Sequence, residues 1–471
     1  MTETLTPDLC VIGAGSGGLS VAAAAAGFGV PVVLIEKGRM GGDCLNYGCV
    51  PSKALLAAAK HAAAPRRAGA FGLKLPRAEV DFAKVNAHVH GVIAAIAPND
   101  STERFTGLGV HVIAGAARFT NARTVTVGDF EIRARRFVVA TGSTAAVPPI
   151  PGLDATPYLT NETIFELKTC PEHLVIIGGG PIGLELAQAH RRLGSAVTVL
   201  EAAIPLAKDD PECAQIVLAQ LAHEGVTIRS GVKVARVGHE DGKVQAFLEG
   251  GETIVGSHLL VATGRKPNTE GLDLAAAGIN VEPRGIVVGK GLKTTNKKVY
   301  AIGDVAGGPQ FTHVANYHAG IVIRNALFRL PAKANHDTVP WVTFTDPELA
   351  HVGLTEAQAR ERHKTVRVLR WPYHENDRAQ AERETHGHIK VVTAKNGKIL
   401  GATIVGAHAG ELITTWTLAL AQGLNIRAMT GIVVPYPTLA EIGKRAAITY
   451  FSSSLTSSTV RRLIGFLRRF G

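Results

Sequence analysis

A strand–turn–helix pattern occurs twice in this chain of 471 residues, and the two copies match at a constant offset of 165 residues (Gly13 corresponds to Gly178). Each copy begins with an apolar run that predicts a buried strand and continues into a glycine-rich turn that opens a helix. A second apolar run follows each helix and ends in an acidic residue. The duplication predicts two α/β units built on parallel sheets. The residues that define the copies are Gly13, Gly15, Gly18 and Glu36, then Gly178, Gly180, Gly183 and Glu201.

The spacing of these glycines indicates dinucleotide binding. Glycine allows a tight turn and lets the backbone approach a pyrophosphate at the helix N-terminus. The acidic residue at the end of the second strand accepts hydrogen bonds from ribose hydroxyls. One isolated G-x-G-x-x-G turn is weak support, but two copies in the correct context predict two bound dinucleotides.

Two further features are consistent with this repeated architecture. The apolar runs at 137–140 and 259–262 each end in Thr-Gly, at Thr141-Gly142 and Thr263-Gly264. Such a turn lets backbone pass close to a cofactor. A later strand at 299–302 leads into Asp304, at the carboxyl end of a parallel strand, where ligands bind in open α/β sheets. An ordinary turn or a helix cap is the alternative role for Asp304.

Two cysteines, Cys44 and Cys49, follow the first copy, and Lys53 comes four residues later. In a regular helix their Cα atoms would be about 7.5 Å apart along the axis, whereas a disulfide requires about 4.4–6.8 Å. If these cysteines bond, the backbone must be distorted, and Gly48 is the residue that permits it. Because a strained disulfide is easier to reduce, the pair suits redox chemistry better than structural cross-linking.

Composition excludes several other classes. Five cysteines are too few for a disulfide scaffold, and the first eight residues lack the pattern of a secretory signal, so we expect a cytoplasmic protein. The net charge of +11 is spread along the chain without interleaved aromatic residues, so no nucleic-acid partner is expected. The apolar run 19–35 is interrupted by glycine and proline, which favours a helix, a turn and a strand over a membrane span. No metal ligands are predicted.

The cysteine segment 41–53, both glycine turns, and the segments 301–304 and 344–348 together resemble the class I pyridine nucleotide–disulfide oxidoreductases, the family of glutathione reductase, dihydrolipoyl dehydrogenase and mercuric reductase. The resemblance covers nearly the whole chain. It implies an α/β fold with two Rossmann-like domains, for FAD and NAD(P), and a C-terminal α+β dimerisation domain. The implied boundaries are 1–150 and 272–339 for FAD, 151–271 for NAD(P), 340–450 for dimerisation and 451–471 for a basic amphipathic tail.

The resemblance also implies roles for single residues. Cys49 would face the flavin and have a depressed pKa, Cys44 would meet the substrate, and Lys53 would lie near the flavin and pair with Glu185. The second copy would bind the nicotinamide cofactor near Gly264. The residues implied to lie along FAD are Glu36 at the adenosine ribose, Gly115 and Ala116 near the adenine, Thr141 and Gly142 near the flavin, and Asp304 near the ribityl chain.

The nicotinamide cofactor is expected to be NADH rather than NADPH. A carboxylate at Glu201 accepts from a free ribose 2′-hydroxyl and repels a 2′-phosphate. No arginine follows it closely, and Lys208 is the first basic residue after it.

The chain departs from the family pattern near its C-terminus. Members that reduce dithiol substrates carry a histidine where this chain has Tyr436, although the glutamate that orients it is present as Glu441. The reference pKa of tyrosine is near 10, which is unsuited to proton transfer at neutral pH. A tyrosine here resembles mercuric reductase, yet no cysteine follows Cys213 to form the C-terminal pair of that enzyme. Tyr436 could instead pack at a dimer interface.

The resemblance implies a homodimer, and the tail suggests a second kind of contact. A basic amphipathic helix can lie on an anionic membrane surface, or it can dock on its own protein. A flexible linker is expected at 452–458. The apolar face comprises Val460, Leu463, Ile464, Leu467 and Phe470, and the basic face comprises Arg461, Arg462, Arg468 and Arg469.

Together these features predict an enzyme. We expect an FAD-dependent oxidoreductase that passes electrons from NAD(P)H through the flavin to the Cys44–Cys49 disulfide. From there they would reach a small disulfide, dithiol or thiol-ligated substrate, as in dihydrolipoyl dehydrogenase but without the C-terminal histidine. The alternatives are a metal-ion reductase similar to mercuric reductase and a redox-sensing flavoprotein of low turnover.

Overall fold

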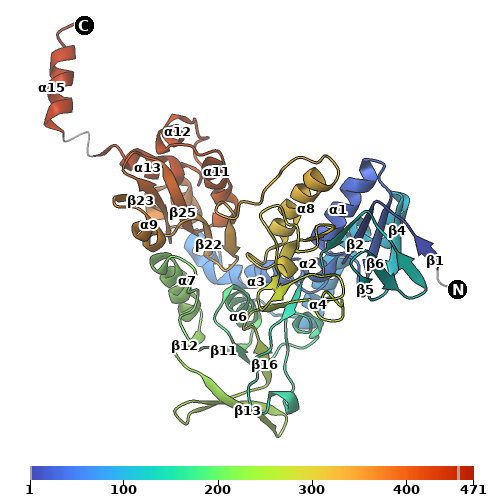
Figure 1. The fold of residues 1–471 in the computed structure, drawn as a ribbon. Coiled ribbons are helices and arrows are strands. Elements are labelled where there is room, and N and C mark those ends of the chain that lie inside the picture. The colour runs from blue at the N-terminus through green and yellow to red at the C-terminus, as the bar shows by residue number, and fades with distance from the viewer. Residues whose placement is uncertain (1–2, 453–456, 471) are drawn as a thin grey trace. The chain divides into compact units, whose positions relative to one another are not determined.

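The computed structural model describes residues 3–452 and 457–470, and its helices and strands are labelled in Figure 1. Contacts divide the chain into two compact units. Unit 1 comprises residues 1–202 and 229–336, and unit 2 comprises residues 203–228 and 337–471. The domain boundaries expected from the sequence stay predictions.

The first glycine turn lies at the carboxyl edge of a five-stranded parallel sheet in unit 1. The strand order is β20 (Val299–Ala301), β8 (Arg136–Val139), β2 (Leu9–Ile12), β3 (Val32–Glu36) and β4 (Val110–Ala114). The helix α1 (Ser16–Gly27) connects β2 to β3 and packs against α8 (Thr312–Ala326). The apolar run 19–35 is therefore a helix, a turn and a strand, as predicted. Both faces of the sheet are buried, which explains the unbroken apolar strands.

The second glycine turn has the same surroundings. Strand β10 (His173–Ile177) lies between β11 (Ala196–Glu201) and β16 (His258–Val261), with all three parallel. The helix α6 (Pro181–Leu193) leads from β10 to β11. A short antiparallel ribbon, β9 (Ser143–Ala145) with β17 (Arg265–Pro267), follows β8 and β16 respectively. The predicted duplication of a parallel α/β unit is confirmed.

Unit 2 is built on a five-stranded antiparallel sheet. Its order is β21 (Trp341–Thr343), β22 (Glu348–Gly353), β25 (Ile399–Gly406), β24 (His388–Ala394) and β23 (Val366–Pro372). Helices α11 (Ala409–Ala421), α13 (Glu441–Thr449) and α7 (Pro211–His223) contact this sheet. The predicted α+β character of the C-terminal part is confirmed.

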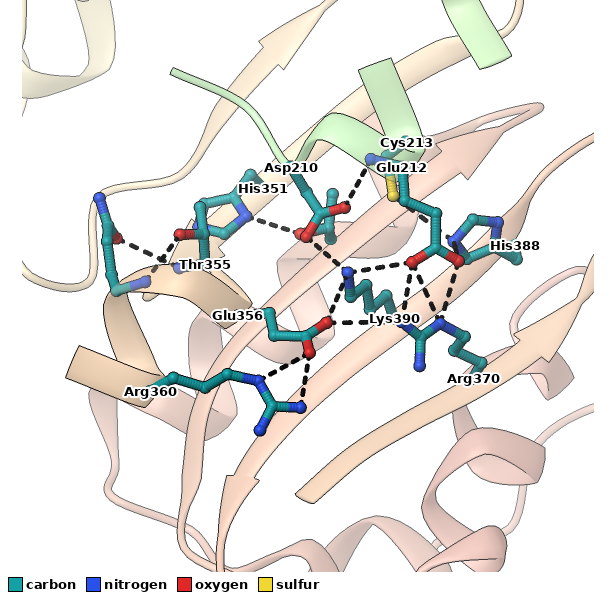
Figure 2. A network of polar contacts seen from close by, with 12 residues as sticks. Asp210, Glu212, Cys213, His351, Thr355, Glu356, Arg360, Arg370, His388 and Lys390 are labelled. Atoms are coloured by element: carbon teal, nitrogen blue, oxygen red, sulfur yellow. Dashed lines mark hydrogen bonds and ion pairs between the residues drawn. The ribbon is translucent and has the colours of Figure 1, made fainter. Parts of the chain in front are cut away.

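A buried lysine joins α7 to that sheet (Figure 2). Lys390 Nζ lies 2.7 Å from Asp210 Oδ2, 3.0 Å from Glu212 Oε2 and 2.8 Å from Glu356 Oε2, and its side chain is 5% exposed. Burial lowers the pKa of Lys390, but its hydrogen bonds to the three carboxylates outweigh that effect and raise the pKa above its ordinary value. Lys390 thus joins carboxylates that are distant in sequence, and Arg370 also binds two of them, Glu212 and Glu356.

Most of the remaining elements lie outside the three sheets described above. No helix in the described ranges has both the length and the apolar character needed to cross a bilayer. The other elements are α4 (Phe82–Ile96), α5 (Thr102–Gly107), α9 (Glu356–Arg362), α10 (Asp377–Glu382), α12 (Ile426–Gly431), α15 (Ser458–Leu467), β1 (Glu3–Leu5), β5 (Arg118–Asn121), β6 (Thr124–Val127), β7 (Phe130–Ile132), β12 (Val226–Ser230), β13 (Val234–Glu240), β14 (Lys243–Leu248), β15 (Thr253–Gly256), β18 (Val281–Glu282) and β19 (Gly285–Ile286).

Candidate redox site

The cysteine segment forms two helices with a break between them. Helix α2 (Gly42–Asn46) contains Cys44, and helix α3 (Cys49–Ala68) begins at Cys49. The break falls at Tyr47 and Gly48, which is where a distorted backbone was expected. A Cβ atom added to Gly48 would lie 2.9 Å from the Asp43 carboxylate and 3.0 Å from the Asp43 carbonyl oxygen. Glycine is therefore required for this close approach.

The break brings the two cysteine side chains together as hydrogen-bonded thiols. The side-chain hydrogen bond from Cys44 lowers the pKa of Cys49 to about 6, against the opposing effect of burial. The same bond raises the pKa of Cys44 above its ordinary value. The two thiols therefore differ in acidity, and Cys49 is the more acidic of the two.

Two further groups favour the Cys49 thiolate. Its sulfur lies 3.5 Å from the hydroxyl oxygen of Thr312, at the start of α8, and that contact also lowers the Cys49 pKa. The positive charge of Lys53 acts in the same direction. Lys53 Nζ donates to Glu185 Oε2 at 2.9 Å, so the pair implied by the resemblance lies together, with Lys53 on α3 and Glu185 on α6. Their catalytic roles stay predictions.

The two glycine turns share one hydrogen-bond geometry. Glu36 Oε2 accepts from the amide of Ala14 at 2.6 Å, and Glu201 Oε2 accepts from the amide of Gly179 at 2.6 Å. In each copy the acidic residue at the end of the second strand therefore contacts the turn after the first strand. Glu36 Oε1 also accepts from the amide of Gly38 at 2.7 Å.

The glycines of each turn fit a bound dinucleotide. A Cβ atom on Gly18 would lie 1.8 Å from the Gly13 carbonyl oxygen, and one on Gly183 would lie 2.0 Å from that of Gly178. The outer glycines therefore close each turn. The middle glycines, Gly15 and Gly180, cap α1 and α6 without a side chain that could occupy their first amides. These amides are the groups that would hold a pyrophosphate.

Other predicted cofactor residues lie at strand ends of unit 1. Thr141, after β8, donates through Oγ1 to the Asn268 carbonyl oxygen at 2.7 Å. Gly115 follows β4, and its amide donates to the Glu36 carbonyl oxygen at 2.8 Å. The neighbours Ala116, Gly142 and Gly264 lie at the corresponding strand ends, and Asp304 lies in the turn after β20. The binding roles of these residues stay predictions.

Tyr436 and Glu441 lie in unit 2, on the segment that connects α12 to α13 and at the start of α13. Tyr436 donates through its hydroxyl to Asp377 Oδ2 at 2.8 Å, and its side chain is exposed. The hydrogen bond to Asp377 raises the pKa of Tyr436 further, assisted by the charges of Asp377 and Glu441. The Tyr436 hydroxyl therefore stays protonated at neutral pH, where it donates a hydrogen bond and cannot serve as a base.

Sequence reasoning missed several residues around the cysteines. Thr312 carries no motif, and it is separated from Cys49 by more than 260 residues of chain. Asp43 lies inside the recognised cysteine segment, and Arg265 directly follows Thr263-Gly264, so proximity to a motif could have marked both. Asn161 had no signal in the sequence, and in unit 2 the same holds for Asp377, the partner of Tyr436.

The chain is similar to known proteins over most of its length. Residues 7–319 match the family described as pyridine nucleotide-disulphide oxidoreductase, and residues 339–447 match the dimerisation domain of that family. A mercuric reductase from Bacillus cereus is 39% identical over 450 residues, which cover 94% of this chain and 71% of that protein. A dihydrolipoyl dehydrogenase from Thermus scotoductus is 38% identical over 453 residues, which cover 93% of this chain and 95% of that protein.

A solved structure is also similar to this chain over most of its length. The HOCl-induced flavoprotein disulfide reductase RclA from Escherichia coli, in its Cu(II) complex, superposes with a TM-score of 0.86. It is 30% identical in sequence, and the match covers 94% of this chain and 99% of that one. The chain therefore belongs to the class I pyridine nucleotide–disulfide oxidoreductases, enzymes that bind FAD and take electrons from NAD(P)H.

Proposed function

We propose that this enzyme reduces a disulfide or a thiol-bound metal ion through Cys44 and Cys49, with NADH as the preferred electron donor. The observation that carries the proposal is the break between α2 and α3, which brings the Cys44 and Cys49 side chains together one helical turn before the Lys53–Glu185 ion pair. Bound FAD supplies the capacity to take up a hydride and to deliver its electron pair to sulfur.

The chain's own residues would then perform the exchange. Two electrons and two protons convert the Cys44–Cys49 disulfide to a dithiol. Cys44, once deprotonated, attacks a substrate disulfide, forms a mixed disulfide and releases the first substrate thiol. The Cys49 thiolate attacks Cys44 in that mixed disulfide, which releases the second thiol and restores the internal disulfide. Cys49 is suited to this step because its thiolate is populated at neutral pH.

A thiol-bound metal ion is the second candidate substrate. Tyr436 replaces the histidine that accepts a proton from dithiols, and its raised pKa leaves no base at that position near neutral pH. Reduction of a metal ion held by two thiolates requires no such base. The mercuric reductases among the relatives and the Cu(II) complex of RclA support this candidate.

Steady-state NADH oxidation by the FAD-loaded enzyme separates these substrates. The assay compares lipoamide, low-molecular-weight disulfides, and Hg(II) or Cu(II) offered in excess thiol. Activity with a disulfide or metal that disappears in Cys44→Ala and Cys49→Ala supports the proposal. A four-electron uptake in anaerobic NADH titration, falling to two electrons in either variant, supports the cysteine pair as a second redox centre. Negligible turnover with every substrate would favour a redox sensor instead.

The choice of NADH rests on Glu201 at the end of β11. A carboxylate there would accept from the ribose 2′-hydroxyl and repel the phosphate of NADPH. The Glu201 carboxylate already binds the turn amide of Gly179, which fixes its position. A ratio of kcat/KM that favours NADPH would contradict this preference.

The functional form is proposed to be a homodimer in which the C-terminal domain of each subunit completes the site of the other. The match to the family's dimerisation domain supports it. The segment between α12 and α13 also exposes Val433 almost fully, at 94%, beside Tyr436. Ile432 and Tyr436 on the same segment are exposed as well, and clustered apolar exposure is typical of an interface. A monomer by sedimentation velocity, with full activity, would contradict the dimer.

A contact with an anionic membrane surface is proposed for α15. Its apolar side chains at 463, 464, 466 and 467 are each more than half exposed. Its polar face carries arginines, and no acidic residue occurs after Glu441. A short helix with this pattern binds lipid interfaces weakly, and two copies in a dimer would strengthen the contact.

A further inference from the structure

Asp43 is anchored on both sides of the break in the cysteine segment. It lies in the first turn of α2, directly before Cys44. Its Oδ1 atom accepts from Arg265 Nη2 at 3.1 Å and from Asn161 Nδ2 at 3.1 Å. The same Asn161 amide donates to the Tyr47 carbonyl oxygen at 3.2 Å. One carboxylate and one amide therefore hold the backbone on either side of the turn that brings the cysteines together.

Arg265 connects this carboxylate to a second one. Its side chain is only 13% exposed, and its Nε atom donates to Ser143 Oγ at 2.7 Å. Its Nη2 atom donates to the Ser143 carbonyl oxygen at 2.8 Å, and Nε lies 3.8 Å from Asp304 Oδ2. Ser143 Oγ in turn donates to Asp304. A planar guanidinium suits this role because its donors point in several fixed directions.

We propose that Asp43 and Arg265 form a positioning pair that fixes the cysteine segment and balances the charge at Cys49. The inference rests on the proposed redox role of the two cysteines and names residues that tune it. Neither residue reacts with the substrate. Their effect is exerted through the position and the ionisation of Cys49.

The charged and titratable groups around Cys49 come from four elements: Cys44 and Asp43 on α2, Lys53 on α3, Glu185 on α6 beside Lys53, and the Thr312 hydroxyl on α8. Among them Asp43 opposes the thiolate, because its negative charge raises the pKa of Cys49. Arg265 is bound to Asp43 and offsets that negative charge. The two members of the pair should therefore act on Cys49 with opposite signs.

The opposite signs can be tested. If Asp43 and Arg265 had only a structural role, the two substitutions would not shift the pKa of Cys49 in opposite directions. Each variant is made in a Cys44→Ala background, in the FAD-loaded enzyme, so that Cys49 titrates without its partner thiol. The rate of iodoacetamide alkylation of the Cys49 peptide is followed by mass spectrometry from pH 5 to pH 10. The midpoint of that profile gives the pKa of the Cys49 thiol. Because the background has no disulfide, the measurement requires no NADH.

Asp43→Asn keeps the shape of the side chain and removes its charge, so the midpoint should fall by about one pH unit. Arg265→Gln leaves the Asp43 charge uncompensated, so the midpoint should rise by about one pH unit. The double variant should return to within about half a unit of the background, and Arg265→Lys, which keeps the charge, should stay near it. Arg229→Gln, which breaks a surface arginine–glutamate pair, is the matched control and should change nothing.

Single variants that shift the midpoint in the same direction, or leave it unmoved, would overturn the proposal. If Arg265→Gln fails to fold, the other two variants still test the proposal. The alkylation midpoint must fall in Asp43→Asn and must stay unchanged in Arg265→Lys. Failure of the wider redox proposal would appear differently. NADH would then not reduce the cysteine pair of the enzyme with both cysteines present, whatever the alkylation profiles show.

Discussion

Lys53 and Glu185 form an ion pair between α3 and α6, with 2.9 Å between Nζ and Oε2. The glutamate side chain is 7% exposed, whereas that of the lysine is 37% exposed. A nearly buried carboxylate thus holds a cation in place four residues after Cys49, where its positive charge favours the thiolate. The pair links the glycine-turn helix of the second nucleotide-binding copy to the cysteine segment that follows the first.

Replacement of Lys53 by methionine should therefore raise the midpoint for Cys49 alkylation by about one pH unit, because the thiolate loses a neighbouring positive charge. Lys53→Arg keeps that charge and should keep the midpoint. Both are measured by peptide-resolved alkylation of the reduced enzyme. A methionine variant with an unchanged profile would show that Lys53 does not influence Cys49.

The reduced enzyme should lose its reactive thiolate as pH falls through about 6, since the pKa of Cys49 is lowered to that value. The folded pKa lies below that of a free cysteine, near 8.5, so the thiolate is favoured in the folded state between these two pH values and is protonated below the lower one. Thiolate absorbance at 240 nm should titrate with one midpoint near 6, and disulfide reduction should decline over the same range. A single midpoint above 8 would contradict the inferred asymmetry.

Tyr436→His should increase lipoamide turnover by about tenfold or more, because a histidine titrates near neutral pH and can accept the proton of a dithiol. Asp377 would accept a hydrogen bond from the new imidazole as it does from the tyrosine hydroxyl. Tyr436→Phe, which lacks any titrating group, is the control and should show no gain. An intact dimer of Tyr436→His without improved lipoamide turnover would remove position 436 from proton transfer.

Flotation with lipid vesicles tests α15 in the full-length enzyme. Binding is expected with vesicles that contain phosphatidylglycerol, less at high salt, and not with pure phosphatidylcholine, because the arginines require anionic lipid. Leu463→Glu with Leu467→Glu should abolish it. The matched control, Leu73→Glu with Leu75→Glu, also alters two exposed leucines and should leave binding unchanged. Tail-dependent self-association without lipid binding would reject the membrane surface as the partner.

Lys390→Met should destabilise unit 2 by about 3 kcal/mol, because it leaves the buried Asp210 carboxylate without its cation. Methionine is close to lysine in size, so the cost arises from the charge left uncompensated among the carboxylates around Lys390 (Figure 2). Arg360→Met removes an arginine that is 58% exposed and leaves Glu356 paired with Lys390, so it should cost less than about 1 kcal/mol. Urea unfolding of the FAD-loaded enzyme compares the two. Equal destabilisation by both substitutions would show that burial at Lys390 is unimportant.

The parts of the site that depend on local backbone geometry could be predicted from the sequence. The outer glycines of each turn sit where a side chain would strike a carbonyl oxygen, so their spacing, repeated between a strand and a helix in both copies, identifies the turns. Gly48 was identified for a similar reason, since two cysteines five residues apart cannot meet on a regular helix. The replacement of histidine by Tyr436 was visible once the family resemblance was recognised.

The groups that set the chemistry of Cys49 could not be found in this way. Thr312, Arg265 and Asn161 reach the cysteine segment from distant parts of the chain, and no motif marks Thr312 or Asn161. The hydrogen bond from Tyr436 to Asp377 likewise joins residues that are far apart in the sequence. The sequence by itself determined the nucleotide-binding turns and the cysteine pair, because short-range sterics restrict which residues can occupy them. Only the tertiary structure decided which distant groups, Thr312 and Arg265 among them, reach the cysteine segment in which Cys49 was already expected to be the more acidic thiol, because charge interactions depend on distance in space and not on separation along the chain.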